Sequence, residues 1–359
     1  MRTIDVNLAD RAYPIILDSG SLGQIGDFLR ERFEADAPVV VITDENVGRI
    51  YTDSVECAIA DAGFDVLIHV IEPGETSKRL ETVSRIYDFL IKHKTPRAGI
   101  IVALGGGVVG DVASFVASTY KRGVPYVAVP TSLLAHVDSS VGGKTGIHHG
   151  GEKNVIGTFY QPRLVLIDID TLRTLPTREL LAGMAEVVKY AVALDGELFS
   201  FLESSYQKVL RLKPGPLLHV IGRCCELKAG LVEQDEFDEG PRHVLNYGHT
   251  IAHALEASTG FRVFLHGEAV SIGVVAAAKV SRAVGRCSDE DVRRQERLLR
   301  AIGLPTRLDK AAIPRLIDHL YADKKLVADK IRLVVCTGIG SADLWPVAPE
   351  ELVRHLSAL

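Results

Sequence analysis

The stretch ALGGGVVGDVASFVA, residues 103–117, combines the end of an apolar strand, a glycine turn and the start of an apolar helix. Glycines in such a turn let the backbone approach a ligand closely, and the free N–H groups at the helix start bind phosphate groups well. The glycines at 105–107 and 110 lack the spacing of the usual dinucleotide fingerprint. A tight turn without a ligand therefore remains an alternative, in which Asp111, expected in the first helical turn, complements the helix dipole.

Short β-rich runs surround this turn and alternate with helical patterns. They cover residues 38–43, 64–71, 99–107, 125–130 and 163–169. Fully apolar strands separated by helices predict a parallel sheet with helices on both faces. The opening residues, TIDVNL and then YPIIL, alternate more between apolar and polar side chains, which predicts a hairpin added at an edge of the sheet.

Helical periods dominate from TLPTREL (174–180) onward, and KIRLVVCTGIG (330–340) is the one strand expected there. At 359 residues the chain is long for a single core, so two domains are predicted. We place the boundary at residue 174, with an α/β domain over 1–174 and a mainly helical domain over 175–359. Ligand sites favour domain interfaces, so the reaction is expected in the cleft between the halves.

The composition is that of an ordinary globular protein. Hydrophobic residues make up 47% of the chain, charged residues 24%, and the mean hydropathy is +0.16. The net charge of −5 and the scattered basic residues argue against nucleic acid or a membrane surface as a partner. The apolar runs are too short for a signal peptide or a membrane span, and the five cysteines form no CxxC pair. These features predict a cytoplasmic protein with reduced thiols.

A second polar segment, VDSSVGGKTGIHHGGEKN (137–154), is rich in glycine and carries two lysines. Backbone N–H groups and ammonium ions together suit a phosphate group. The segment does not fit the Walker pattern, and a flexible surface loop remains the alternative.

The helical half contains polar residues in apolar surroundings. Glu186 and Lys189 lie one helical turn apart in GMAEVVKYA, and burying such charges is costly unless they are paired or bind a metal. His249 and His253 share one helix face, and His266 opens the next helix. Two histidines and a carboxylate with an open position suit a catalytic zinc ion. The His249 and His253 spacing matches metalloprotease helices, but the HExxH glutamate is missing, so spacing leaves the choice of ligands open.

Eight motifs, in family order and spread over nearly the whole chain, resemble the 3-dehydroquinate synthase family of sugar-phosphate cyclases. They are PGETSK (73–78), GGGVVGD (105–111), PTSLLAHVDSSVGGKTG (130–146), EKNVIGTFYQP (152–162), AGMAEVVKY (182–190), NYGHTIAHALE (246–256), HGEAVSIG (266–273) and DKK (323–325). The resemblance implies a Rossmann-like NAD-binding α/β domain followed by an all-helical domain that binds metal and substrate.

The resemblance also implies a role for each matching position. Zinc, with cobalt as the alternative, would be held by Glu186, His249 and His266. Residues that would contact NAD are Asp44, Asn46, Glu75, Lys78, Gly106, Gly107, Val108, Gly110, Asp111, Thr131, Ser132, Lys144, Lys153, Thr171, Leu172 and Thr174. Catalytic roles would fall to His253, Lys144, Asp138, Lys189 and Asn246, and further substrate contacts to Arg122, Asn154, Lys228, Arg242, Lys324 and Lys325. Glu256 is left with a structural role.

The implied reaction belongs to a lyase of the shikimate pathway, which leads to the aromatic amino acids. It converts 3-deoxy-D-arabino-heptulosonate 7-phosphate to 3-dehydroquinate and phosphate through transient oxidation by NAD, elimination, reduction and aldol closure. His253 would relay a proton, and Arg122 would reach a neighbouring subunit in a homodimer. Alternatives are a related sugar-phosphate cyclase and a metal-dependent glycerol or alcohol dehydrogenase. The chain departs from the family pattern at Glu152, which replaces the usual glycine, and in the preceding HHGG segment.

Overall fold

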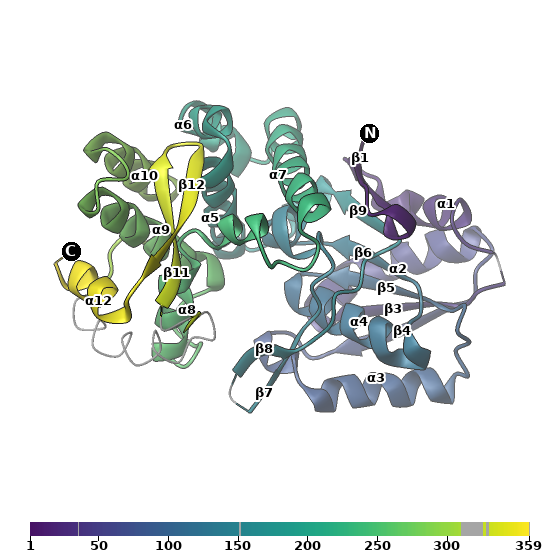
Figure 1. The fold of residues 1–359 in the computed structure, drawn as a ribbon. Coiled ribbons are helices and arrows are strands. Elements are labelled where there is room, and N and C mark those ends of the chain that lie inside the picture. The colour runs from purple at the N-terminus through teal and green to yellow at the C-terminus, as the bar shows by residue number, and fades with distance from the viewer. Residues whose placement is uncertain (35, 151, 310–325, 328–329, 359) are drawn as a thin grey trace. The chain divides into compact units, whose positions relative to one another are not determined.

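The computed structural model describes residues 1–359 except 35, 151, 310–325, 328–329 and 359 (Figure 1). The chain forms two compact units: Met1–Leu175 with Lys228–Phe237, and Pro176–Leu227 with Asp238–Leu359. The predicted division had assigned 228–237 to the helical half, but these residues pack with the first unit. Glu233 Oε1 accepts hydrogen bonds from Asn7 N at 2.6 Å and Asn7 Nδ2 at 2.8 Å, which helps to hold this segment there.

The first unit is built on a seven-stranded sheet. In sheet order the strands are β1 (Arg2–Val6), β2 (Tyr13–Asp18), β9 (Leu164–Asp168), β6 (Tyr126–Pro130), β5 (Ile100–Gly105), β3 (Val39–Asp44) and β4 (Val66–Ile71). Strand β1 pairs antiparallel with β2, and all other neighbours are parallel. The five predicted strands and the edge hairpin are confirmed. Strands β3 and β5 consist almost entirely of buried Val, Ile, Leu and Ala, as expected for strands covered on both faces.

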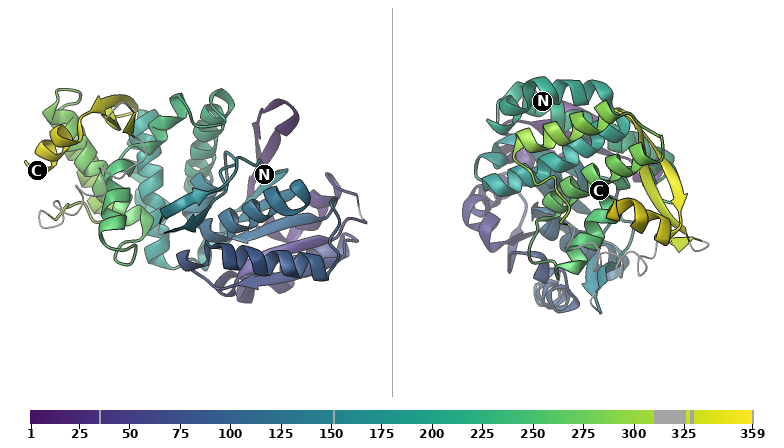
Figure 2. Two further views of the ribbon diagram at one scale, coloured as in Figure 1. Left: turned by 60° about the horizontal axis from the view of Figure 1, so that its bottom comes forward. Right: turned by 90° about the vertical axis from the view of Figure 1, so that its left-hand side faces the viewer.

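Helices cover both faces of this sheet. Helices α1 (Ile25–Arg30) and α2 (Glu45–Asp61) pack on one face, where Leu29, Val55 and Ile59 join strand residues in a continuous apolar core. Helices α3 (Leu80–Lys92) and α4 (Gly107–Thr119) lie together on the other face (Figures 1 and 2). A small antiparallel hairpin, β7 (Ile147–His149) and β8 (Glu152–Ile156), overlaps the end of the glycine-rich segment 137–154, for which a flexible surface loop was the alternative.

The second unit is mainly helical, as predicted. The α-helices among its described residues are α5 (Thr177–Leu194), α6 (Gly196–Leu210), the first part of α7 (Pro214–Gln234), α8 (His249–Ser258), α9 (His266–Ala283), α10 (Asp289–Ile302) and α12 (Pro349–Ser357). Helix α9 is apolar on nearly every side and almost wholly buried, so it forms the centre of this unit. By contrast, α10 buries one narrow stripe and exposes its charges.

The expectation of an all-helical second domain needs a correction. An antiparallel sheet of β10 (Leu326–Val327), β11 (Lys330–Gly338) and β12 (Ser341–Val347) packs within this unit. Strand β11 lies within the predicted run at 330–340, whereas β12 was missed. Pro346 and the lack of a regular alternation of buried and exposed residues in SADLWPV obscure the strand pattern. Pairing with β11 supplies the backbone partners instead.

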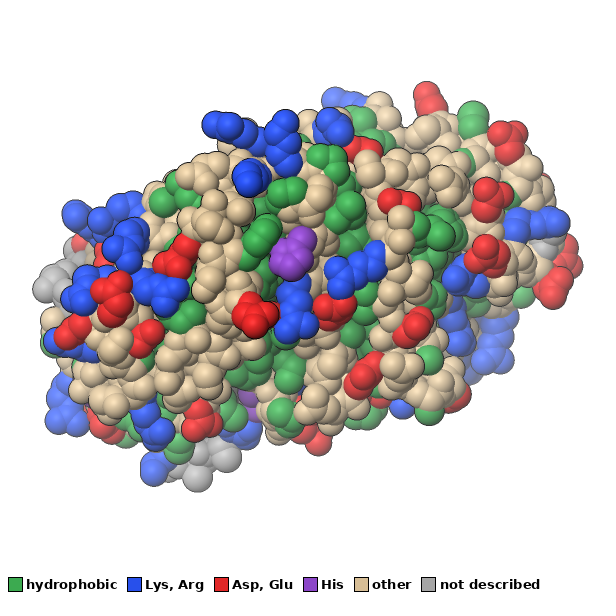
Figure 3. Space-filling model, turned by 90° about the horizontal axis from the view of Figure 1, so that it is seen from above, with side chains coloured by type: hydrophobic (Ala, Val, Ile, Leu, Met, Phe, Trp, Pro, Cys, Tyr) green, Lys and Arg blue, Asp and Glu red, His purple; other side chains and the backbone are tan. Residues whose placement is uncertain are grey.

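The structure agrees with the scattered charges and short apolar runs of the sequence. On the face seen in Figure 3, Lys and Arg side chains are intermixed with Asp and Glu. Among the described residues, no helix combines the length and apolar character needed to cross a bilayer.

Two glycines bring α8 and α9 into direct backbone contact. Gly248, which precedes α8, has a left-handed φ of 79°, and a Cβ added there would lie 2.7 Å from Val274 N. A Cβ added to Gly273, on α9, would lie 2.1 Å from Gly248 O. Only glycine fits such distances, so this crossing fixes the position of His249, the first residue of α8.

Replacing Gly273 by alanine should therefore destabilise the second unit. We expect the free energy of unfolding to fall by about 1–3 kcal/mol, because backbone must move to admit the methyl group. Equilibrium urea unfolding followed by circular dichroism measures this change. Gly215→Ala is the matched control, since a Cβ there meets nothing within 4 Å and alanine in a helix gains at most about 1 kcal/mol. Wild-type stability in Gly273→Ala would contradict the prediction.

Candidate functional site

A buried ion pair lies in the middle of α5. The side chains of Glu186 and Lys189 are 0% and 1% exposed, and Oε2 of the glutamate lies 2.7 Å from Nζ of the lysine. Removing two charges from water costs several kcal/mol per ion, which good geometry and further polar partners must offset. The predicted juxtaposition of carboxylate and amine is therefore present, in a setting that calls for additional partners.

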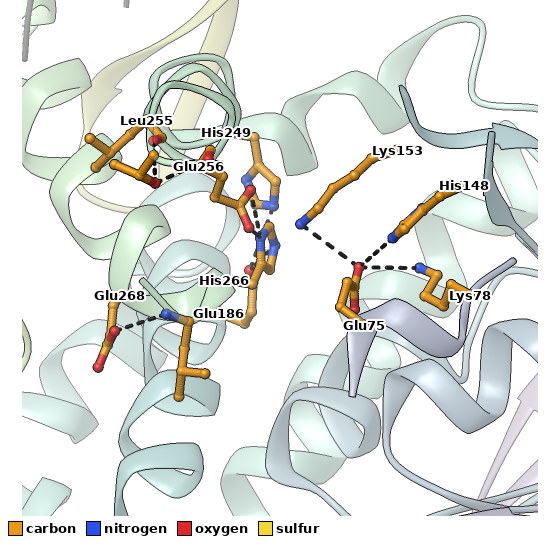
Figure 4. A network of polar contacts seen from close by, with 12 residues as sticks. Glu75, Lys78, His148, Lys153, Glu186, His249, Leu255, Glu256, His266 and Glu268 are labelled. Atoms are coloured by element: carbon orange, nitrogen blue, oxygen red, sulfur yellow. Dashed lines mark hydrogen bonds and ion pairs between the residues drawn. The ribbon is translucent and has the colours of Figure 1, made fainter. Parts of the chain in front are cut away.

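Two histidines from other helices meet the same carboxylate. Nε2 of His249 lies 3.5 Å from Glu186 Oε1, and Nε2 of His266 lies 3.4 Å from that oxygen (Figure 4). In a tetrahedral zinc site with bonds of roughly 2.0–2.1 Å, neighbouring ligand atoms are about 3.4 Å apart. Glu186, His249 and His266 thus have the donor types and two of the spacings that a divalent metal ion requires.

His253 offers a competing set of ligands. It lies one turn further along α8, with its ring centroid 5.4 Å from that of His249 and 5.9 Å from that of His266. Nitrogen atoms of these three histidines all lie within 4.8 Å of one another. His253 is the most exposed of the three. His249 and His266 each place Nε2 within 3.5 Å of Glu186 Oε1. Both sets share His249 and His266.

The carboxylates around His266 control its charge. Burial lowers the pKa of this imidazole, but hydrogen bonds and ionic contacts with Glu186 and Glu256 outweigh burial and raise the pKa to about 10. The surroundings of His266 therefore favour positive charge. The residues form a site for positive charge.

In the first unit, the glycine turn lies between β5 and α4. Gly106 is the N-cap of α4 and has no side chain to cap the helix. The cavity beside it is lined by Gly105, Gly106, Gly110, Pro130, Ser139 and Lys144, among others. The start of α4 thus presents backbone N–H groups to a small cavity, as a phosphate site requires.

Asp111 does not lie in the first turn of α4, as was expected, because the helix starts at Gly107. Its carboxylate binds Nζ of buried Lys78 at 2.6 Å instead. Burial raises the pKa of Asp111, which the ammonium of Lys78 partly offsets. Burial likewise opposes the charge of Lys78, but Asp111 and Glu75 raise its pKa. The attraction between the ammonium of Lys78 and the carboxylate of Asp111 therefore opposes the cost of burying both groups.

Glu75 is the centre of a second polar network in this unit (Figure 4). Its Oε1 lies 3.0 Å from Nε2 of His148 and 3.7 Å from Nζ of both Lys78 and Lys153. Nδ1 of His148 accepts a hydrogen bond from Asn154 N at 3.1 Å, so Nε2 carries the proton that Glu75 accepts. Burial would raise the pKa of Glu75, but the hydrogen bond from His148 and the two lysines lower it to about 2.

Other predicted residues of the first unit lie near the carboxyl ends of strands or at the starts of helices. Asp44 caps α2 through bonds of 2.9 Å from its Oδ1 to the N–H groups of Asn46 and Val47. Thr131 and Ser132 follow β6. Val108 lies in the first turn of α4 and Leu172 in a short helix after β9, while Thr171 and Thr174 both contact the hydroxyl of Tyr51.

Asp138 and Lys228 form a close pair. Asp138 lies in a single π turn, Ala135–Ser139, a feature that is frequent at functional sites. Nζ of Lys228 donates to the backbone oxygen of Asp138 at 2.6 Å and forms an ion pair with its carboxylate. Lys228 belongs to the segment of α7 that packs with the first unit, so this contact lies within one unit.

Several other predicted residues have clear positions. Arg242 is buried and Asn246 half-buried in the short helix Pro241–Asn246, which leads into α8. Arg122 is exposed and has a left-handed φ of 65°. Asn154 is exposed on β8. Lys324 and Lys325 lie outside the described residues.

Comparisons with known proteins cover both halves of the chain. Residues 68–182 match the model of the 3-dehydroquinate synthase N-terminal domain, and residues 183–326 match that of the C-terminal domain. The 3-dehydroquinate synthase of Desulforamulus reducens is 47% identical over 346 residues, which is 96% of each chain. The chain belongs to the 3-dehydroquinate synthase family.

Solved structures of other cyclases have the same fold as this family member. A 2-deoxy-scyllo-inosose synthase complexed with carbaglucose-6-phosphate, NAD⁺ and Co²⁺ is 26% identical, with a TM-score of 0.87 over 99% of this chain and 100% of that chain. The 2-epi-5-epi-valiolone synthase of Streptomyces hygroscopicus, with NAD⁺ and Zn²⁺ bound, is also 26% identical, with a TM-score of 0.84 over 96% of each chain.

Two residues of the family member went unrecognised in the sequence. His148 belongs to the HHGG segment that departs from the family pattern, yet it holds Glu75 and also donates its backbone N–H to Lys78 O at 2.7 Å. Glu256 contacts Nδ1 of His266, so its role is not limited to forming the helix. For Glu256 the available signal was its position one turn beyond His253 on the apolar side of the helix. Glu152, the added carboxylate, is exposed on β8.

The lowered pKa of Glu75 makes the stability of the first unit depend on pH. Because the folded-state pKa lies near 2 and the ordinary value is 4.5, ionised Glu75 stabilises the fold above about pH 4.5 and loses this effect as the pH falls toward about 2. Glu75→Gln should therefore be less stable than wild type at neutral pH, and the difference should shrink below about pH 4.5.

Urea unfolding at several pH values between about 3 and 7 tests this dependence. Asp10→Asn is the control, since the side chain of Asp10 is 90% exposed. A stability difference between wild type and Glu75→Gln that stays constant down to about pH 3 would contradict the assignment.

Proposed function

We propose that this enzyme converts 3-deoxy-D-arabino-heptulosonate 7-phosphate to 3-dehydroquinate and phosphate, using NAD and a divalent metal ion. The carrying observation is the convergence of His249 and His266 on the buried carboxylate of Glu186. The 47% identity to a 3-dehydroquinate synthase supports this choice of reaction. The two cyclase structures bind NAD⁺ with Co²⁺ or Zn²⁺, which supports both cofactors and leaves cobalt beside zinc.

The metal would be held by Glu186, His249 and His266. When bound, it would polarise the alcohol that is oxidised, so that its proton leaves more easily. NAD, held at the start of α4 and by residues such as Asp44, Glu75 and Lys78, would accept and later return the hydride. We assign His253, which is exposed and lies one turn from His249, to moving a proton rather than to binding the metal.

Cationic side chains would bind the two anionic groups of the substrate. Lys189, Lys228 and Arg242 are buried to 1–5% exposure, where an ammonium or guanidinium group binds carboxylate or phosphate strongly. Asp138 holds the ammonium of Lys228 in place. A cyclase whose substrate lacks a carboxylate would not need both Lys228 and Arg242, which favours the heptulosonate phosphate. Asn246, Lys144 and Asn154 complete the proposed set of described substrate residues.

A homodimer is part of the same proposal. Arg122 is exposed, and its backbone and that of Lys121 adopt left-handed conformations, with φ of 65° and 48°. Such backbone is costly for residues with side chains and is often retained at functional sites. We assign Arg122 to the phosphate of a substrate bound by a neighbouring subunit.

The reaction itself is the first test. Purified enzyme with substoichiometric NAD, zinc and the heptulosonate phosphate should release phosphate and form dehydroquinate in equal amounts, because NAD is regenerated in each cycle. Omission of NAD, or addition of a chelator, is the control and should abolish both products. Absence of phosphate release under complete conditions would refute the proposed reaction, and NADH accumulating from glycerol would identify a dehydrogenase instead.

Histidine variants separate the two ligand sets. His266→Ala should weaken zinc binding by at least about 100-fold, because it removes a ligand. His253→Ala should keep the metal and lower turnover by about 10²–10⁴-fold, because it removes a proton relay. Zinc content after dialysis and kcat are the measurements. Equal loss of zinc from both variants would instead support the set of three histidines.

A further inference from the structure

Glu256 is a buried carboxylate to which the proposed function gives no task. It lies on α8 and is 3% exposed. Both of its carboxylate oxygens are 3.4 Å from Nδ1 of His266, the first residue of α9 (Figure 4). A buried carboxylate is costly unless polar or charged groups face it. Its position against an imidazole therefore calls for an explanation beyond helix formation.

The contact determines which ring nitrogen of His266 is available to a metal. A neutral imidazole, the form that binds a metal, that donates from Nδ1 to a carboxylate keeps its proton there and leaves the lone pair of Nε2 free. Nε2 of His266 is the atom that faces Glu186, at 3.4 Å. The contact with Glu256 and the contact with Glu186 thus use opposite sides of one ring.

His249 is arranged in the same way with a neutral partner. Its Nδ1 lies 3.2 Å from the backbone oxygen of Tyr247, and its Nε2 lies 3.5 Å from Glu186 Oε1. Both rings are therefore held through Nδ1 and turned with Nε2 toward one carboxylate oxygen. Metal-binding histidines in proteins are commonly oriented by such outer partners.

We propose that Glu256 is a positioning residue for a divalent metal ion: it holds His266 with the proton on Nδ1 and with Nε2 directed toward the ion. The inference rests on the proposed function in one respect, that Glu186, His249 and His266 hold the metal. Glu256 also places a second carboxylate beside the cluster, and its negative charge makes His266 a stronger donor. The side chain does not itself bind the metal.

Substitutions at Glu256 distinguish this role from a purely structural one. Glu256→Met fills similar space but accepts no hydrogen bond, so zinc should bind roughly 10–100-fold more weakly. Glu256→Gln keeps an oxygen that accepts from Nδ1–H, so its zinc affinity should stay within about tenfold of wild type. Zinc affinity is measured by competition with a chelating dye, and the absorption spectrum of the cobalt-loaded protein reports the geometry at the metal.

Ser281→Ala is the matched control for lost buried polar contacts. Ser281 lies on the same helix, α9, is buried, and bonds Ala277 O at 2.7 Å and Cys336 N at 2.9 Å. This variant should be destabilised without any change in zinc affinity or cobalt spectrum. If Glu256→Met loses affinity while Ser281→Ala and Glu256→Gln do not, the positioning role is supported.

Two results would overturn the inference. One is zinc affinity in Glu256→Met equal to that of wild type. The other comes from zinc-loaded wild type labelled with ¹⁵N-histidine, a measurement that does not depend on any variant folding at position 256. His266 should show a protonated Nδ1 and a metal-bound Nε2, and the reverse tautomer would refute the proposed arrangement.

The outcome is separable from that of the proposed reaction. Zinc binding that depends on Glu256 in a protein that releases no phosphate from the heptulosonate phosphate would support the positioning role and refute only the reaction. If the wild type releases phosphate but Glu256→Met binds zinc as tightly as the wild type, the proposed reaction is supported and only the positioning role is refuted.

Discussion

The burial of the Glu186 carboxylate is the constraint around which the second unit is organised. An ionised group with 0% exposure requires positive or polar partners, and Lys189 on the same helix provides the first at 2.7 Å. His249 and His266 supply the others from the starts of two further helices. Their positions depend on backbone contacts that only glycine permits, at Gly248 and Gly273. The close packing of α8 and α9 therefore also places the histidines that contact Glu186.

Outer contacts extend this arrangement. His249 is held by a backbone oxygen and His266 by the carboxylate of Glu256. A ring with one nitrogen engaged has only the other to offer, so these contacts decide how the histidines face Glu186. They orient the two imidazole rings, whereas the types of donor atom alone would allow several arrangements.

In the first unit, the charged groups that need partners lie near the start of α4. Its glycine turn leaves the start of α4 open to a ligand, while Lys78 is held by Asp111 and Glu75 close to that helix. His148 reaches Glu75 from the hairpin of β7 and β8. The segment that departs most from the family pattern therefore still supports the proposed NAD site, through its own histidine, and Glu152 remains on the exposed side.

The sequence by itself determined the elements with a strong pattern: five apolar strands, an edge hairpin, the long apolar helices and the pairing of Glu186 with Lys189 one turn later. In each of these, the local pattern of apolar and polar residues indicates the type of element without reference to distant parts of the chain. Tertiary structure alone decided the pairing of β12 with β11, the association of residues 228–237 with the first unit, and the contact of Glu256 with His266. These depend on partners distant in the chain or on the crossing of two helices. Spacing along one helix places Glu256 and His253 on a face, but only packing decides which imidazole that carboxylate meets.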